Sequence, residues 1–165
     1  IDLDPVVKAA KEVALFEEGV VFDGFSAAGI KGLLKSSGHK DQKMPDENES
    51  LLKAVSAGVE TLKAAAISGP WSIIINPEKW QEMVASHKGY PLSKQVNEIT
   101  GGRIITSSAI SGMILVSERG GDFELTLGAD FSIGYENHDH ETITFFLTES
   151  MAFRVLEPNA LLVFK

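Results

Sequence analysis

Four consecutive polar residues have the types and spacing that come closest to a chemical site: His138-Asp139-His140-Glu141. Side chains on a β-strand alternate between its two faces, so His138 and His140 would share one face. Two imidazoles on one face are able to bind a divalent metal ion, but a tetrahedral site needs further ligands from elsewhere in the chain. The sequence therefore favours a simpler interpretation, in which these residues form the polar tip of a hairpin between two strands.

Other signatures of catalysis do not match the sequence. It has no Walker phosphate-binding loop, no Gly-x-Ser-x-Gly turn and no His-Glu-x-x-His zinc pair. With 0 cysteines, it can form no disulfides, thiolate metal sites or cysteine nucleophiles. Serine, histidine and aspartate are present, but a catalytic triad is recognised by geometry and not by composition. We therefore expect no enzyme activity, no metal site and no cofactor.

The composition excludes several classes of partner. Of the 165 residues, 44% are hydrophobic and 23% are charged, which is typical of a globular chain. No apolar run reaches the roughly 18 residues that span a bilayer, so we expect no membrane partner. The formal net charge of -8 disfavours binding to a nucleic-acid backbone. The first residues lack the basic and apolar regions of a signal peptide, which fits a cytoplasmic location.

The elements that must position these residues begin with an amphipathic helix. Asp4 can cap its first turn, and Pro5 suits the first helical position, where a missing N–H costs nothing. Apolar residues then recur at helical spacing and would form one face: Val6, Ala9, Ala10, Val13, Phe16 and Val20. Glu17 lies near the middle of that face, so either the helix turns there or this carboxylate has a buried partner.

The rest of the first half is predicted to be mostly helical. In order, the pattern predicts a short helix over 26–35, an exposed polar loop over 36–50, a helix over 51–66, a strand over 71–75, and helices over 77–86 and 92–99. The strand is apolar and β-branched, so we expect it to be buried on both faces. Gly69-Pro70 ends the long helix, and Gly101-Gly102 ends the last one.

From residue 103 onward the apolar period changes to that of strands. The predicted strands are 104–105, 113–116, 123–127, 131–135, 143–147, 151–155 and 161–164. Gly120-Gly121 lies between two of these runs and predicts a tight hairpin. Helices come first and antiparallel strands follow, so the sequence predicts an α+β fold.

Several stretches of the sequence carry a specific resemblance. In order, they are KGLL at 31–34, YPL at 90–92, GGRIIT at 101–106, VSERGGDF at 116–123, LGADFSIGYE at 127–136 and TE at 148–149. In this order and at these spacings, they resemble the encapsulin shell proteins, also called the linocin bacteriocin family. The resemblance runs over nearly the whole chain, and its most specific parts are SERGGDF and SIGYE.

The resemblance implies the fold of the major capsid protein of tailed bacteriophages, with a peripheral and an axial domain. The spine helix of the peripheral domain and the loop after it would occupy residues 1–50. Residues 51–111 would form the axial domain, which meets its copies around the five-fold axes, and residues 112–165 would return to the peripheral domain. Family members begin with an N-terminal helix and an extended loop, so this sequence resembles a member that is truncated at its N-terminus.

The function that the resemblance implies is structural. Encapsulin subunits self-assemble into an icosahedral shell, a nanocompartment in the cytoplasm, around a cargo enzyme such as a ferritin-like iron oxidase or a dye-decolorising peroxidase. The expected partners are therefore copies of the chain and a cargo protein, bound through its C-terminal targeting peptide. Two alternatives stay open. One is a phage or prophage major capsid protein, disfavoured by the closer match to the shell motifs, and the other is a bacteriocin or protease, disfavoured by the missing export signal and triad.

One stretch matches the loop that lines the five-fold pore of the family. It consists of His87, Lys88, Gly89 and Tyr90. A histidine in that position would give the ring of subunits a charge that depends on pH near neutrality. The alternative is an ordinary surface turn before a proline.

A second stretch matches part of the inner surface that holds the cargo's targeting peptide. It consists of Asp130, Phe131, Ser132 and Ile133. The alternation of apolar and polar residues makes Phe131 and Ile133 equally plausible as ordinary core residues.

Overall fold

Apolar strands from distant parts of the sequence build a four-stranded sheet. The computed structural model describes residues 2–46, 48–86 and 88–165. The strand order is β4-β3-β5-β8, in which β4 is parallel to β3, β5 is antiparallel to β3, and β8 is antiparallel to β5. The strands are β3 Trp71–Ile75, β4 Gly101–Thr106, β5 Met113–Ser117 and β8 Leu161–Phe164. Each confirms a predicted strand.

The central strands are buried on both faces, because each face is covered by a separate layer. On β5, Met113 and Leu115 belong to one apolar cluster, whereas Ile114 and Val116 belong to another. Alternation along a strand sends neighbouring side chains to opposite faces, so two adjacent residues serve two different cores. The prediction that residues 71–75 are buried on both faces is confirmed.

Three helices cover the first face. They are α2 Asn48–Ala64, α3 Pro77–Ser86 and α4 Leu92–Thr100. The side chains of α2 that pack on the sheet are fully or almost fully buried and recur at helical spacing: Leu51, Val55, Val59 and Leu62. Asn76 caps α3 as predicted, because its Oδ1 accepts from the Glu78 N–H over 3.0 Å.

Helix α1, Asp4–Phe22, approaches the second face with its C-terminal end. Its last turn contributes Phe22 to the cluster on that face, while Phe16 is 56% exposed. The cap differs from the prediction, because Leu3 occupies the cap position and the Asp2 carboxylate accepts from the Asp4 N–H. The helix is therefore anchored at its C-terminal end.

The helix predicted over 26–35 is wrong. The segment instead forms strands β1 Gly24–Phe25 and β2 Ile30–Lys31, which pair, and 3-10 turns at Ser26–Ala28 and Leu33–Lys35. Glycine is the physical reason, because a Cβ on Gly32 would lie 2.4 Å from the backbone of Phe22 and Gly24. The chain folds back on itself at this point, which a helix could not do.

The predicted polar loop lies along an edge of the sheet. The Gln42 N–H donates to the Val163 carbonyl over 2.8 Å, and the Lys165 N–H donates to the Gln42 carbonyl over 2.9 Å. Gln42 also bridges Phe164 in parallel orientation. The loop is therefore ordered by backbone bonds to β8, although most of its side chains are exposed.

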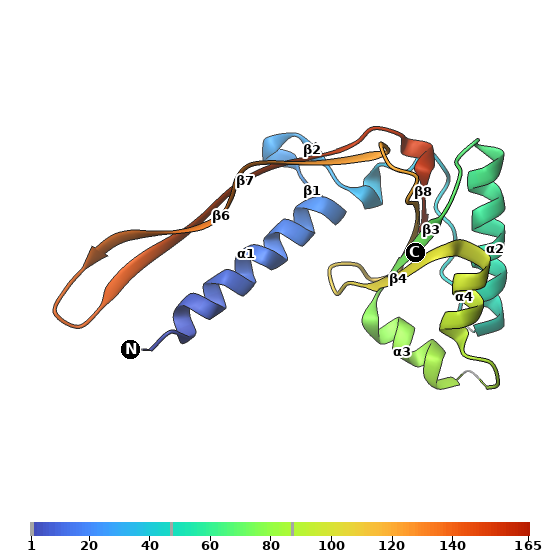
Figure 1. The fold of residues 1–165 in the computed structure, drawn as a ribbon, viewed down its shortest axis with the longest axis horizontal. Helices are drawn as coiled ribbons and strands as arrows, with labels where there is room; N and C mark the ends of the chain where they lie inside the picture. The colour runs from blue at the N-terminus through green and yellow to red at the C-terminus, as the bar shows by residue number, and fades with distance from the viewer. Residues whose placement is uncertain (1, 47, 87) are drawn as a thin grey trace.

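The remaining strands form a separate two-stranded ribbon, which consists of β6 Phe123–His138 and β7 Ile143–Val155. The hairpin predicted at Gly120-Gly121 is wrong, because these residues connect β5 of the sheet to β6 of the ribbon, and the two strands do not pair. Figure 1 shows the ribbon and α1 extending away from the sheet on one side, with α2, α3 and α4 on the other.

The architecture is α+β, as predicted. Strands β5 and β8 of the sheet belong to residues 112–165, the range expected to return to the peripheral domain. They pack against elements from residues 51–111. Within the described ranges, none of the helices is both long and apolar enough to cross a membrane.

Candidate functional site

The residues expected to form the cargo surface lie in the middle of β6, where the strand bulges. The pairing passes from Ala129 opposite Ser150 to Ser132 opposite Thr148, so β6 has one residue more than β7 in this interval. Asp130 Oδ1 accepts from the Phe131 N–H over 2.7 Å. A bulge twists a strand and re-aims its side chains, so Asp130 and Phe131 depart from regular alternation here.

The expected cargo surface is exposed in this chain. Phe131 is 41% exposed and Ile133 is 55% exposed, so the alternative that they are core residues is wrong. Other large apolar side chains of the ribbon are also exposed: Leu125, Leu127, Tyr135, Ile143, Phe145 and Phe146. Exposed apolar surfaces of this kind are typical of contacts with other molecules.

Part of this surface faces α1 across a shallow groove. One hollow of about 250 Å³ is lined by Val6 and Ala9 of α1 and by Ile133, Ile143 and Phe145 of the ribbon. A neighbouring hollow of about 370 Å³ continues along the same two elements. Residues of the apolar face predicted for the first helix therefore line hollows that they share with the ribbon, and Figure 1 shows α1 running beside the ribbon.

Carboxylates lie close together where α1 approaches the middle of the ribbon. Burial raises the pKa of Glu149, and the negative charges of Glu17 and Asp130 raise it further. The adjacent Glu18 has a different environment, because its Oε1 accepts from the Ser107 hydroxyl over 3.0 Å. Glu17 is half-buried, and its negative charge acts on the Glu149 carboxylate of β7.

The loop expected to line the pore joins α3 to α4. His87 lies outside the described residues, while Lys88, Gly89 and Tyr90 are exposed. Gly89 has a φ of 98°, a conformation that side chains other than glycine rarely adopt. The Tyr90 hydroxyl donates to Glu98 Oε1 over 2.9 Å, and this bond is the main reason that the pKa of Tyr90 is raised. Residues 88–90 thus form an exposed turn that the bond from Tyr90 to Glu98 ties to α4.

The four polar residues at 138–141 form the end of the ribbon. Asp139 Oδ1 accepts from the N–H groups of Glu141 and Thr142 over 2.8 and 2.7 Å, and these bonds lower the pKa of Asp139. His138 Nδ1 bonds to the Tyr135 hydroxyl. The interpretation as a polar hairpin tip is confirmed. In the described part of the chain, no three carboxylate or imidazole side chains are arranged to hold a metal ion.

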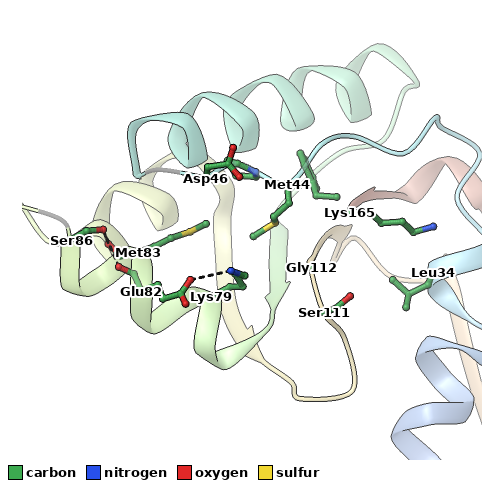
Figure 2. Close-up of a pocket in the computed structure, with 12 residues that line it drawn as sticks. Leu34, Met44, Asp46, Lys79, Glu82, Met83, Ser86, Ser111, Gly112 and Lys165 are labelled. Atoms are coloured by element: carbon green, nitrogen blue, oxygen red, sulfur yellow. Dashed lines mark hydrogen bonds and ion pairs between the residues drawn. The ribbon is translucent and has the colours of Figure 1, made fainter.

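A cavity that the sequence did not reveal lies between α3, the segment before α2 and the end of β8 (Figure 2). Its volume is about 570 Å³, and its lining includes Met44, Met83 and Phe164. An ion pair between Lys79 and Glu82, 3.1 Å long and largely exposed, lies on α3 at the cavity (Figure 2). The cavity thus combines an apolar lining with an exposed charged pair.

The motif SERGGDF contributes polar contacts that sequence reasoning also missed. Glu118 Oε1 accepts from the Ser72 hydroxyl over 2.7 Å and from the Arg103 guanidinium over 2.8 Å. The bond from Ser72, followed by that from Arg103, lowers the pKa of Glu118. The three residues are far apart in the sequence, so the resemblance could indicate that the motif matters but not what it touches.

Comparisons with known proteins agree with this architecture. The chain matches, over residues 1–152, the family model described as "Encapsulating protein for peroxidase". It is 36% identical over 161 residues to the type 1 encapsulin shell protein of Rhodospirillum rubrum, which covers 96% of this chain and 58% of that protein. It is 34% identical over 153 residues to that of Mycobacterium tuberculosis, covering 92% and 58%. The chain therefore spans less than two thirds of the length of these relatives.

Solved structures show the same fold. A chain of a virus-like particle from Pyrococcus furiosus superposes with a TM-score of 0.81 at 22% identity, covering 99% of this chain and 68% of that chain. A chain from Mycobacterium phage Che8 superposes with a TM-score of 0.72 at 12% identity, covering 99% and 63%. The expected capsid-like fold is confirmed. Together with the family match, this shows that the chain belongs to the encapsulin shell proteins of the linocin family.

Proposed function

We propose that this chain is a structural subunit of an encapsulin nanocompartment and assembles with copies of itself into an icosahedral shell. The observation that carries the proposal is the ribbon, which leaves large apolar side chains in water along both of its strands. Such a surface is costly for an isolated chain and becomes favourable when another subunit covers it. In this proposal the chain has a structural role and no catalytic one.

We infer further that the shell encloses a cargo enzyme in the cytoplasm. The matched family is described as encapsulating protein for peroxidase, and a relative in Pyrococcus furiosus is a ferritin-like-encapsulin shell fusion protein, 24% identical over 169 residues. These descriptions support a dye-decolorising peroxidase or a ferritin-like iron oxidase as cargo. A peptide at the C-terminus of the cargo would bind Asp130, Phe131, Ser132 and Ile133, whose apolar members are exposed for such a contact.

The loop with His87, Lys88, Gly89 and Tyr90 would line the five-fold pore of this shell. Its support is the exposure of residues 88–90 and the bond from Tyr90 to Glu98, which ties Tyr90 to α4. In a ring of five copies, Lys88 would place five positive charges around one opening. This arrangement would favour the passage of anions over cations.

The alternative of a phage or prophage capsid protein shares the fold, but the similarities are unequal. The phage chain is 12% identical, whereas the shell protein of Rhodospirillum rubrum is 36% identical. The other alternative, a bacteriocin or protease, gains no support from His39 near β8. The Nε2 atom of this histidine lies 3.0 Å from the backbone carbonyl of Asn159. The shell subunit remains the better-supported function.

Light scattering with negative-stain electron microscopy of the purified chain tests the assembly. We expect the chain to associate with copies of itself into species larger than a monomer, and a chain that stays monomeric at micromolar concentration contradicts the proposal. Leu127→Thr should shift the population toward small species, because Leu127 is 46% exposed on the ribbon and lies outside the proposed cargo surface. Val84→Thr, which changes a 45% exposed residue on α3, is the matched control for lost apolar surface.

The cargo assignment has a separate test. Fluorescence anisotropy would measure the binding of two labelled synthetic peptides, one from the C-terminus of a dye-decolorising peroxidase and one from a ferritin-like protein. We expect one peptide to bind and Phe131→Ser to weaken it at least ten-fold, while Phe146→Ser serves as control for an exposed aromatic elsewhere on the ribbon. Equal losses in both variants would contradict the assignment to Phe131.

A further inference from the structure

The chain segments that join the ribbon to the sheet lie together in one region, which we call the joint, beside the buried Phe153 that packs in the second apolar cluster. The joint consists of residues 66–70 between α2 and β3, residues 117–122 between β5 and β6, and residues 156–157 after β7. Backbone bonds tie these segments together, since the Glu118 N–H donates to the Pro70 carbonyl and the Leu156 N–H donates to the Asp122 carbonyl, each over 2.8 Å. The joint therefore brings together the turn that leaves α2 and the roots of both ribbon strands.

The Arg119 side chain holds two of these segments at once. Its Nε lies 3.0 Å from Asp122 Oδ2, and its Nη2 lies 2.7 Å from Asp122 Oδ1. Its Nη1 donates to the Ala66 carbonyl over 3.1 Å. The planar guanidinium presents these donors in a fixed fork, so one side chain sets the distance and the angle between the two segments.

Burial distinguishes this ion pair from the surface pairs of the molecule. The Asp122 side chain is 4% exposed and that of Arg119 is 29% exposed. A matched pair on the ribbon, between Arg154 and Glu124, has side chains that are 66% and 41% exposed. Solvent screens an exposed pair and leaves its geometry loose, whereas a buried charge needs its partner in place.

The Ala66 carbonyl is itself held in one position. Ala66 follows α2 with a φ of 62°, and the Ile67 N–H donates to the Leu62 carbonyl while the Ala66 N–H donates to that of Lys63. These bonds form a Schellman motif, which ends the helix in one defined geometry. Arg119 thus connects the ribbon root to a rigid helix end and not to a mobile loop.

Because the ribbon is long, a small rotation at the joint becomes a large displacement at the tip. Strand β6 has 16 residues, which corresponds to about 50 Å at roughly 3.3 Å per residue. A rotation of about 5° at the root then moves the tip by about 4 Å, which is comparable to the strand spacing of roughly 4.8 Å. Contacts between subunits on the ribbon would not survive such a displacement.

We propose that Arg119 is a positioning residue that fixes the direction in which the ribbon leaves the sheet. Its bonds to Asp122 and Ala66 fix the joint, and the ribbon carries that geometry to its tip. The consequence for a shell, that the joint sets the angle between neighbouring subunits, rests on the proposed function. The direction itself is a property of one chain.

Spin labels measure this direction, because the chain has 0 cysteines and two can be introduced without removing others. Ser56→Cys on α2 and Glu136→Cys on β6 place a label on each side of the joint, at exposed positions. Pulsed electron paramagnetic resonance, with labelled chains diluted in unlabelled ones, gives the distance distribution within one chain. We expect Arg119→Lys to widen this distribution at least two-fold, because one ammonium cannot reproduce the fork.

The matched control is Arg154→Lys, the same change in the exposed pair of the ribbon, which should leave the width unchanged. An unchanged width in folded Arg119→Lys, or an equal widening in Arg154→Lys, overturns the proposal. Should Arg119→Lys reduce the folded fraction, the double variant R119Q/D122N removes both charges and is measured in its place, with the same expected widening. All these outcomes are independent of whether the chain forms a shell.

Hydrogen exchange separates a positioning role from general stabilisation. In Arg119→Lys, the amides of Glu118 and Leu156 should exchange at least ten-fold faster, because their bonds lie in the joint. The amides of Ile114 and Leu115 in the sheet should keep their wild-type rates. An equal acceleration of all four amides shows that Arg119 only stabilises the fold, and it overturns the proposal.

Discussion

The sheet and the ribbon are built from the same alternation of residues but reach opposite degrees of burial. Ile73 on β3 is 1% exposed, whereas Ile133 on β6 is 55% exposed. The sheet has helices α2, α3 and α4 on one face and the end of α1 on the other, while the ribbon is a single layer that α1 faces across a groove. Alternation thus predicts a strand, but the neighbouring layer decides whether its side chains are buried.

The difference also separates the two roles of apolar surface. In the sheet, burial stabilises the chain itself, at roughly 25 cal/mol for each Å² removed from water. On the ribbon, the same side chains contribute little to the folding of one chain and remain available to a second molecule. Mutations in the two regions should therefore act on different measurements.

The largest contrast is expected for a pair of leucines. Leu115→Ala, at 0% exposure on β5, should lower the free energy of unfolding by about 2–5 kcal/mol, because it leaves a cavity between α2 and the sheet. Leu125→Ala, at 46% exposure on β6, should lower it by less than about 0.5 kcal/mol. Urea unfolding followed by circular dichroism measures both, and similar losses would erase the distinction between the regions.

A smaller contrast is expected for the two ion pairs. Asp122→Ala removes a buried carboxylate and should lower the free energy of unfolding by about 2 kcal/mol. This loss is smaller than for a fully buried ion pair, because the Arg119 side chain is partly exposed. Glu124→Ala on the ribbon should cost no more than about 0.5 kcal/mol. The same urea titrations decide this point. A cost for Glu124→Ala equal to that of Asp122→Ala would contradict the assignment of the joint as the rigid region.

Replacement by glycine should change the stability in opposite directions at two alanines, one in the joint and one within α2. Ala66→Gly should stabilise the chain by about 0.5–1 kcal/mol, because glycine adopts the positive φ of this position without strain. Ala57→Gly, in the interior of α2, should destabilise it by about 1 kcal/mol through the lower helix propensity of glycine. Differential scanning calorimetry should show melting temperatures that move in opposite directions.

The smallest effect is expected for the carboxylates between α1 and the ribbon. The pKa of Glu149 is raised in the folded chain, so the folded state favours its protonated form. This contribution is fully present below the unfolded pKa of about 4.3 and is lost as the pH rises through the folded pKa. Glu149→Gln should therefore be more stable than the wild type at pH 7, with the difference vanishing near pH 4. Thermal unfolding across this range measures it, and Glu136→Gln controls for net charge.

The sequence predicted the elements of the sheet better than their connections. Helix starts at Asn76-Pro77 and the strand at Trp71–Ile75 depend on local signals, and both were correct. The hairpin at Gly120-Gly121 was wrong, because both glycines do adopt positive φ but the turn joins strands of different sheets. A local turn signal describes the backbone at the turn and carries no information on which strands pair.

The functional surfaces show the same limit. The resemblance named residues 130–133 and 87–90, but their exposure depends on which layers cover them, and this requires the three-dimensional structure. The bond from Arg119 to Ala66 joins residues 53 positions apart, so no periodicity could indicate it. The ion pair from Arg119 to Asp122 is local, yet its importance follows from the burial of Asp122.

The segment around Gln42 has a consequence for how strands from other molecules can attach. Its parallel bonds to Val163 and Lys165 occupy the outer side of β8, so that margin of the sheet offers no template to a foreign strand. The opposite margin is β4, whose backbone pairs with β3 on its inner side. Unwanted growth of the sheet by strand addition, the route to amyloid-like aggregates, is thereby directed to one side of the molecule.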